Sequence, residues 1–419
     1  MKDRIPLKSA SLAFYSLIGY FFSCPFSHAL AQLFLGLAIL FTVVSFFGEH
    51  RGLGRFHIGP FFLFILLFVG WSVLSAIVGP TPIKSLLVLK EEWLFLMIPI
   101  AAYLAIDERR IKILMTALAL SAIIVSLYAV FQHFTGHDLY HGGMLVPAPS
   151  GSGYRVSGLF SNRMTYGNFF AVAAMLFLGI APFAEKWSRK ALFYAAFFLA
   201  ALTTVFTYSR GSIVVLAIGI VLFIIISTRK HLKTIILLLA AFTIVILAVS
   251  PDILSRYSTS AQTEWEGKYA GSRLSIWRTA GRMIEKYPVF GVGQGNFENR
   301  YQSYRDKDSD RIYGHAHNDV LNIAAYAGIP AALFYLGFWA VILICMVTVL
   351  RKLKENRFIR GAVIGIFLGS MAFLMTSTYE ATFADEEIRL FLMALWGVFW
   401  GALNAVKPGG LEAEKIEKA

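Results

Sequence analysis

The sequence predicts an all-α, polytopic membrane protein with about twelve transmembrane helices and one large, partly helical outer loop before the tenth span. Three observations lead to this prediction. The chain is 57% hydrophobic and only 15% charged, whereas soluble domains are roughly 45–50% apolar. Apolar windows of about 20 residues, the length that crosses a ~30 Å hydrocarbon core, recur along the chain. The only long polar interval lies between about residues 251 and 328.

The apolar windows set the expected order of elements. We expect spans at roughly 9–22, 28–47, 60–78, 86–105, 111–132, 165–184, 190–208, 211–227, 232–250, 328–350, 358–377 and 387–405. The first window is short and Pro25 separates it from the second, so the two could also form one re-entrant hairpin. The chain therefore divides into helices one to nine (1–250), the outer loop (251–318), helices ten to twelve (319–406) and a tail (407–419).

Charge placement predicts the orientation, because Lys and Arg in short loops stay on the cytoplasmic side. With the N-terminus inside, every inside loop is basic, from Arg51/Arg55 and Arg109/Arg110/Lys112 through Lys186/Arg189/Lys190 and Arg229/Lys230/Lys233 to Arg351/Lys352/Lys354/Arg357/Arg360. Both termini are then cytoplasmic and the large loop faces outside. The net charge of +13 is mostly this collar facing anionic lipid heads, so no nucleic-acid partner is expected.

The first outer excursion, 133–164, contains histidines and two arginines. His133, His137, Asp138 and His141 could be read as a metal site, but helical spacing cannot be assumed in a loop, so we expect none. Arg155 and Arg163 lie in a Gly- and Ser-rich segment just before span six. Free backbone amides, a helix N-terminus and guanidinium groups together suit a phosphate, although lipid heads or loop carbonyls could bind these arginines equally well.

Arg210 follows directly on span seven in the turn Tyr208-Ser209-Arg210-Gly211. Span eight begins at once, so this arginine lies at or just below the outer interface between two apolar helices. An ionisable group buried at full membrane depth costs roughly 2.5–3.5 kcal/mol and is a functional candidate by default. Arg210 is therefore a candidate binding residue.

A helix is expected in the large loop, with Ser272 as its N-cap and Pro288 as its stop. At about 100° per residue, Arg273 falls on the apolar side with Trp277, Ala280 and Ile284, so it should point inward and need an anion. Arg278 and Arg282 point the other way, toward water or lipid heads. The glycines at 291, 293 and 295 resemble a dinucleotide loop only superficially, and a close-packed turn under the helix is the better interpretation.

The loop ends at His315, His317, Asn318 and Asp319, just before span ten. A histidine there could be a satisfied structural residue, but an imidazole near neutral pH can also take a proton. We interpret His317 as a general base, with His315, Asn318 and Asp319 in support and Asp319 as a possible orienting group. Spacing offers no third or fourth zinc ligand, so no metal is expected. Glu380 in the last outer loop adds a carboxylate on the same face, and we count it among the supporting residues with its role left open.

Taken together, these motifs resemble the O-antigen ligase family, which includes related polymerases and protein O-glycosyltransferases. The resemblance rests on Tyr208-Ser209-Arg210-Gly211, the segment 273–296, and His317-Asn318 followed by Gly328. It covers about span six to span ten, and the first five spans match only in character.

The resemblance implies a cofactor-free, metal-independent transferase on the periplasmic face of the bacterial inner membrane. Family members move a glycan from undecaprenyl diphosphate to an acceptor, which in ligases is a sugar hydroxyl of lipid A-core. On the matching positions, Arg210 and Arg273 would hold the diphosphate and His317 would activate the hydroxyl. Arg155 and Arg163 are weaker carry-overs. A polymerase or protein O-glycosyltransferase of the same family, and a transporter or flippase of lipid-linked sugars, remain alternatives.

Overall fold

The structure is a computed structural model that describes residues 9–48, 60–149, 151–226, 272–306, 311–353 and 356–405, together with the single helical residues 240 and 244. Span nine, the first part of the outer loop (251–271), the tail 407–419 and several of the basic loop residues lie outside these ranges. The described elements are helices, with two isolated antiparallel bridges in the loop after α6.

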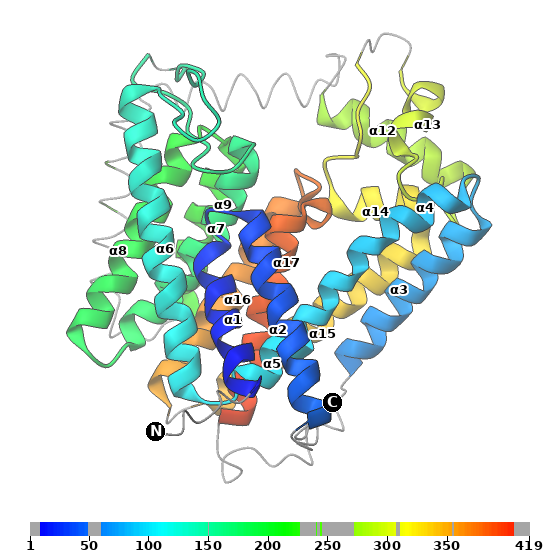
Figure 1. Cartoon of the computed structure of the whole chain (residues 1–419). Coiled ribbons are helices and arrows are strands. Elements are labelled where there is room, and N and C mark those ends of the chain that lie inside the picture. The colour runs from blue at the N-terminus through cyan, green and yellow to red at the C-terminus, as the bar shows by residue number, and fades with distance from the viewer. Residues whose placement is uncertain are drawn as a thin grey trace, which may run out of the picture.

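Their bounds, in chain order, are α1 (Ser9–Ser23), α2 (His28–Gly48), α3 (Pro60–Val78), α4 (Pro82–Val88), η1 (Leu89–Leu96), α5 (Met97–Leu104), α6 (Glu108–Thr135), α7 (Arg163–Ile180), η2 (Ala181–Phe183), α8 (Trp187–Phe206), α9 (Arg210–Ile226), α12 (Arg273–Lys286), α13 (Phe297–Tyr304), α14 (Asp319–Ala327), α15 (Ile329–Lys352), α16 (Arg357–Ser377), η4 (Thr382–Ala384) and α17 (Glu386–Ala405). Figure 1 shows α6 to α9 on one side of the molecule, α3, α4 and α15 on the other, and α12 and α13 at the same end as α14.

Within the described residues, seven helices are long and apolar enough to cross a membrane: α2, α3, α6, α7 with η2, α8, α15 and α16. The shorter α9 is also apolar. A polytopic α-helical membrane protein is therefore supported, while the count of twelve spans stays a prediction.

The predicted fourth span, 86–105, is not one continuous α-helix. It is divided into α4, the 3₁₀ segment η1 and α5. A buried arginine of α17, Arg389, explains the break: it donates to the backbone carbonyl of Glu91 (3.1 Å) and lies 3.4 Å from the carboxylate of Glu92. An acidic pair that must meet this arginine breaks the α-helical repeat, and sequence periodicity alone does not reveal such a distant partner.

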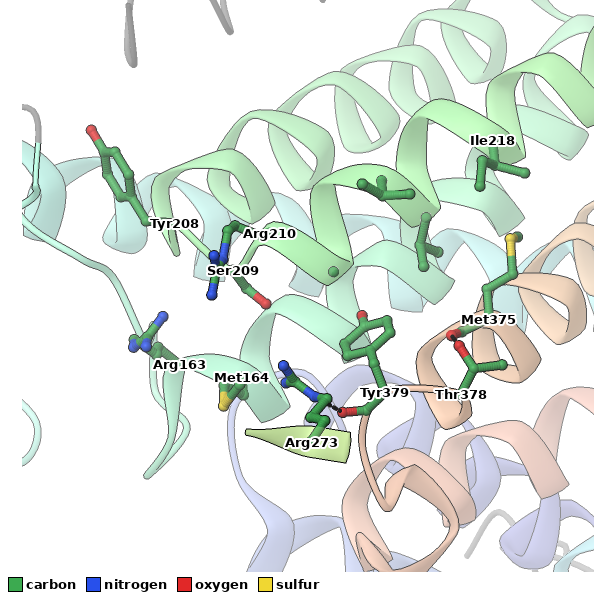
Figure 2. Close-up of a pocket in the computed structure, with 13 residues that line it drawn as sticks. Arg163, Met164, Tyr208, Ser209, Arg210, Ile218, Arg273, Met375, Thr378 and Tyr379 are labelled. Carbon is green, nitrogen blue, oxygen red and sulfur yellow. Dashed lines mark hydrogen bonds between the residues drawn. The ribbon is translucent and has the colours of Figure 1, made fainter. Parts of the chain in front are cut away.

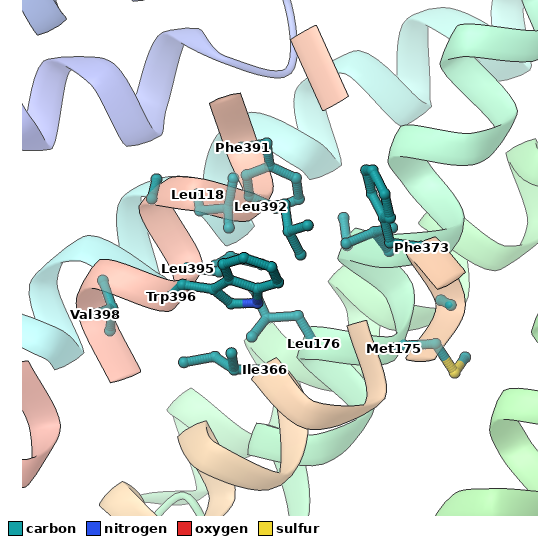
Figure 3. Packing of buried hydrophobic residues seen from close by; sticks show 14 of the residues in the cluster. Leu118, Met175, Leu176, Ile366, Phe373, Phe391, Leu392, Leu395, Trp396 and Val398 are labelled. Carbon is teal, nitrogen blue, oxygen red and sulfur yellow. The ribbon is translucent and has the colours of Figure 1, made fainter. Parts of the chain in front are cut away.

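The centre of the core is the crossing of α7 and α16, where small residues let the two backbones touch. A Cβ on Gly365 would lie 2.4 Å from the carbonyl oxygen of Leu176, and one on Gly179 would lie 2.3 Å from the Cα of Gly365. Glycines at 361, 365 and 369 give α16 the small-residue spacing typical of close membrane-helix contacts. Large side chains pack around this crossing, including Trp396 and Phe373 (Figure 3). The indole NH of Trp396 also donates to Ser370 (3.0 Å).

The outer region has its own small core between α12, α13 and α14. It contains Ile276, Ala280, Met283, Val292, Phe297, Tyr301, Ala316 and Ala325. The glycine turn that precedes α13 packs against the end of α14, because Val292 N donates to Ala325 O (2.8 Å) and a Cβ on Gly291 would lie 2.4 Å from the backbone of Tyr326. The predicted close-packed turn is thus observed, although its main partner is α14.

The predicted helix after Ser272 is α12, and Ser272 caps it by accepting from Ser275 N (3.3 Å). The predicted buried face was displaced by about one position, because its buried residues are Ser275, Ile276, Thr279, Ala280 and Met283. Arg273 lies at the edge of that face and is half-buried. Arg282 is exposed as expected, yet it is held by Asp306 (2.6 Å) and by the carbonyl of Tyr304 (2.7 Å).

Candidate active site

Three arginines surround one cavity, and each is the first residue of a helix. Arg163 begins α7, Arg210 begins α9 and Arg273 begins α12. The cavity has a volume of about 440 Å³. Figure 2 shows the three guanidinium groups arranged around this space, with the ring of Tyr379 beside Arg273. Segments far apart in the chain therefore meet at one basic site.

Arginine is an unfavourable residue for the first turn of a helix, because the partial positive charge of the helix N-terminus repels a cation. With three such placements around one cavity, two sources of positive potential add together: the guanidinium groups and the N-terminal ends of the helices. An anion with several oxygens, such as a diphosphate, is the ligand that relieves this repulsion.

The turn before α9 sets the position of Arg210. Tyr208 has a positive φ of 54°, which is uncommon for a residue with a side chain. The hydroxyl of Thr207 accepts from Ser209 N (3.0 Å) and donates to the carbonyl of Thr204 (2.7 Å), so the turn is held by side-chain hydrogen bonds. This geometry lets α9 start immediately after α8 with Arg210 at its first position.

A buried polar network connects α7, α9 and the last outer loop beneath the arginines. Asn168 Oδ1 accepts from the hydroxyls of Ser212 (2.9 Å) and Tyr379 (3.0 Å). The ring of Tyr379 lies directly on Gly211, where a Cβ would come within 2.2 Å of its Cζ. The glycine of the Tyr-Ser-Arg-Gly turn is therefore required by the close approach of this tyrosine.

The remaining cavity wall is apolar and lies along α9 and α16. It is formed by Val214, Val215, Ile218 and Met375. Val214 is 42% exposed and Ile218 is 43% exposed, on a short helix of apolar composition. The cavity thus combines a cationic end with an apolar side that reaches the surface of the helix bundle.

A histidine–glutamate pair lies next to this cavity. Nδ1 of His317 donates to Oε1 of Glu380 at 2.7 Å, which leaves Nε2 as the ring nitrogen that can accept a proton. His317 also has a positive φ, 49°, and with Tyr208 it is one of two such non-glycine residues in the described ranges. Strained backbone of this kind is concentrated at functional sites.

The charge state of Glu380 suits an orienting role. Burial by itself would raise its pKa, but the hydrogen bond from His317 and the positive charges of His317, His315 and Arg273 hold the pKa of this carboxyl below its usual range. Burial and the neighbouring His317 lower the pKa of His315, against the opposite effect of Glu380. Near neutral pH, Glu380 is therefore ionised and His315 is neutral.

The pair and the arginine cavity share one short segment of chain. Arg273 Nε donates to the carbonyl of Tyr379 (2.9 Å), and Asn318 Nδ2 donates to the carbonyl of Thr378 (3.2 Å). Asn318 also caps α14 by accepting from Leu321 N (3.0 Å). The residues 378–380 thereby hold Arg273 on one side and His317 on the other.

His315, His317 and Glu380 are also the one group in the described ranges whose donor atoms could meet at a metal ion, with all three within 4.8 Å of one another. Glu380 is the third ligand that sequence spacing did not reveal. However, the 2.7 Å contact between His317 and Glu380 is shorter than the roughly 3.3 Å that separates two ligands bound tetrahedrally to zinc at about 2.0–2.1 Å. The arrangement is that of a hydrogen-bonded dyad.

Two predicted residues lie elsewhere. Asp319 does not orient His317: it is 2% exposed and accepts from Phe383 N (3.0 Å) and from the hydroxyl of Tyr335 (3.2 Å). It faces inward because Asp319 begins α14 and turns its side chain toward the helix bundle. Arg155 does not line the cavity; its backbone NH pairs with Val146 in the loop after α6, where its half-buried side chain lies.

The histidines of the same loop have structural partners. His133 stacks on Phe206 with ring centroids 3.8 Å apart, and His141 donates to Asp138 at 2.9 Å. Tyr379 and Asn168 were not predicted as site residues. A tyrosine directly before Glu380 and an asparagine within an apolar span carry no distinctive motif, and only their contacts with Arg273 and Ser212 reveal their roles.

Part of the chain is similar to a known protein family. Residues 195–336 match a family model described as O-Antigen ligase. The match includes Arg210, Arg273 and His317, whereas Arg163, Tyr379 and Glu380 lie outside it. No curated protein matches the chain.

Proposed function

We propose that this chain, whose residues 195–336 belong to the O-antigen ligase family, is a glycosyltransferase. In this proposal it moves an O-antigen-like glycan from undecaprenyl diphosphate to a sugar hydroxyl of lipid A-core. The family supports a lipid-linked glycan donor and a lipid acceptor in general. We place the enzyme in the bacterial inner membrane, with both termini cytoplasmic and the site on the periplasmic face, because the basic loops of the sequence alternate in that sense.

The observation that carries the proposal is the convergence of Arg163, Arg210 and Arg273 at three helix N-termini around one cavity. A transferred glycan leaves a diphosphate that gains one negative charge as the glycosidic bond breaks. Preorganised cationic donors stabilise such a charge more in the transition state than in the bound donor, by about 2.7–4 kcal/mol for one donor. We assign Arg155 a supporting place outside the cavity, on the loop that contacts Tyr208.

The apolar wall fits the other half of the donor. Val214, Ile218 and Met375 continue from the arginines along α9 and α16 toward the exposed surface of the bundle. A polyprenyl chain is apolar and remains in the bilayer while its diphosphate enters a polar site. An amphiphilic cavity of this kind favours a lipid diphosphate over a soluble sugar nucleotide.

The reaction requires a base on the acceptor side. In the proposed step, Nε2 of His317 takes the proton of the acceptor hydroxyl as its oxygen bonds to the anomeric carbon. The bond from that carbon to the diphosphate oxygen breaks, and its electron pair leaves with undecaprenyl diphosphate. The ionised Glu380 stabilises the imidazolium that forms, while His315 and Asn318 hold the segment in place. No metal or other cofactor takes part.

The test is glycan transfer by purified protein in nanodiscs, with undecaprenyl-diphosphate-linked glycan and lipid A-core, in the presence of chelator. We expect product from wild type and losses on the order of 10²–10³-fold in kcat for Arg210→Ala and Arg273→Ala. Arg278→Ala is the matched control, because Arg278 lies on the same helix as Arg273 and is exposed. His317→Ala should lose transfer and retain donor binding.

Other outcomes separate the alternatives. Longer glycans on the lipid donor, with none on lipid A-core, would mean a polymerase, and transfer to a protein hydroxyl would mean a protein O-glycosyltransferase. Movement of the donor across a vesicle bilayer without any new bond would mean a transporter. Equal activity of Arg273→Ala and Arg278→Ala would refute the assignment of the cavity.

A further inference from the structure

The helix α6 has an exposed apolar stripe that does not stop where the helix stops. The stripe contains Leu120, Ile124, Leu127, Phe131 and Phe134, which recur every three or four residues and lie on one face. Beyond the helix, the loop continues it with four large exposed apolar residues: Leu139 (71% exposed), Tyr140 (59%), Met144 (59%) and Val146 (63%). A lipid-facing helix surface is thus continuous with an exposed apolar loop tip.

The length of α6 gives the depth of this tip. Charged residues mark its first five positions, among them Glu108, Arg110 and Lys112, and such residues belong at a membrane surface. About 20 helical residues cross a ~30 Å hydrocarbon core at 1.5 Å per residue. Counted from Lys112, the far boundary lies close to Gln132, so α6 ends about one turn beyond it. The loop begins in the interfacial layer of the leaflet.

Hydrogen bonds hold the tip at that level. Leu145 N donates to Gly136 O (2.8 Å), and His137 and Met144 form an isolated antiparallel bridge. Tyr154 N donates to His133 O (2.9 Å), which ties the segment that leads back from the tip to the last turn of α6. The exposed apolar residues therefore stay beside the helix end and do not extend far into water.

The charges of this segment are equally suited to lipid contact. Between residues 131 and 149 the only acidic or basic side chain apart from histidine is Asp138. It is 7% exposed and is bonded to Tyr128 (3.0 Å) and His141 (2.9 Å). No aspartate, glutamate, lysine or arginine in this segment is exposed, so insertion into the interface desolvates no such charge. Tyr140 adds an amphipathic ring of the kind enriched at membrane interfaces.

We propose that the loop tip 139–146 inserts into the interfacial layer of the phospholipid leaflet at the end of α6. The loop also contacts the arginine cavity, since Tyr208 donates to Ser152 O (3.3 Å) and Val156 N donates to Phe206 O (3.1 Å). Lipid contact at the tip therefore anchors the loop that braces the turn before Arg210. This inference does not depend on the proposed reaction.

The test measures the depth of single labels in lipid vesicles that contain no other protein. In a background in which Cys24 and Cys345 are replaced by alanine, a cysteine at Leu139 or Met144 carries an environment-sensitive fluorophore. We expect a blue-shifted emission, quenching by phosphatidylcholine with a shallow nitroxide, and protection from aqueous iodide. Glu298→Cys on α13, an exposed residue of the outer region, is the aqueous control and should show the opposite pattern.

Ile124→Cys in the middle of α6 is the lipid control and should respond to a deep nitroxide. If labels at both loop positions are quenched by iodide as strongly as the Glu298→Cys label, and not by nitroxide lipid, the proposal is overturned. That pattern would assign the apolar tip to a partner protein, which the vesicles lack.

Discussion

The contact between Glu380 and His317 allows a quantitative prediction for Glu380→Gln. In the wild type, Nδ1–H of His317 donates to a half-buried carboxylate at 2.7 Å. A hydrogen bond to a charged group contributes about 1.5–3 kcal/mol, against about 0.5–1.5 kcal/mol for a neutral one. If the difference of about 1–2 kcal/mol acts on the imidazolium that forms in the transition state, kcat falls about 5–30-fold.

The assay is transfer of a labelled glycan across a range of pH. In Glu380→Gln the lower kcat should persist across the neutral range, because the imidazolium that forms in the transition state loses its counter-charge. Glu298→Gln, which neutralises an exposed carboxylate of α13, is the matched control and should behave as wild type. A double-mutant cycle with His317→Ala should show no further loss from Glu380→Gln, since the carboxylate acts through the histidine.

Stability gives a second measurement on the same variant. The pKa of Glu380 is lowered in the folded protein, so its ionised form contributes stability above the ordinary carboxyl pKa, and this contribution is lost as the pH falls through the lower folded value. The difference in unfolding temperature between wild type and Glu380→Gln should therefore shrink below about pH 4.5. A variant with wild-type kcat would refute the orienting role, whatever its stability.

Three further predictions follow from packing and burial. Gly365→Ala should destabilise the protein by about 1–3 kcal/mol because its Cβ has no space at the α7–α16 crossing, whereas Gly36→Ala, with open space around its Cβ, should be neutral in thermal unfolding. Gly211→Ala should displace the ring of Tyr379 and lower transfer activity more than it lowers the unfolding temperature; an equal effect on both would contradict this. Burial raises the pKa of Asp319 well above its usual range, so the folded state loses stability as the pH rises above the usual carboxyl pKa toward the raised folded one. Asp319→Asn, which cannot ionise, should therefore unfold at a temperature at least as high as wild type at neutral pH, and a large decrease would count against a neutral carboxyl.

The sequence singled out two of the arginines that line the cavity, and their role as diphosphate ligands stays a prediction. Arg210 and Arg273 were identified from an ionisable residue between apolar helices and from a capped helix, and both line the cavity. The direction of Arg273 was less accurate, because α12 buries a face about one residue away from the apolar stripe. Helical periodicity predicts the buried face of a helix to within about one residue position. It does not predict which contact a residue at the edge of that face will make.

The partner of His317 was not predictable. Glu380 is 63 residues further along the chain, and the nearby Asp319 was the natural candidate by proximity. A helix that begins at Asp319 turns its carboxylate into the bundle, toward Tyr335, and no local rule shows which side of α14 will be buried. The break of the fourth span has the same origin, since it depends on Arg389, almost 300 residues away.

The segment Thr378–Glu380 belongs to both halves of the site. Tyr379 gives its carbonyl to Arg273, and the next residue gives its carboxylate to His317. One peptide unit joins these two residues, so we expect a shift of Arg273 on filling of the cavity to displace the carboxylate that contacts the imidazole. In the proposed reaction, transfer to water would destroy the donor without product. A base that is aligned only when the donor site is filled would give an ordered kinetic sequence, in which hydrolysis of the donor stays slow until both substrates are bound.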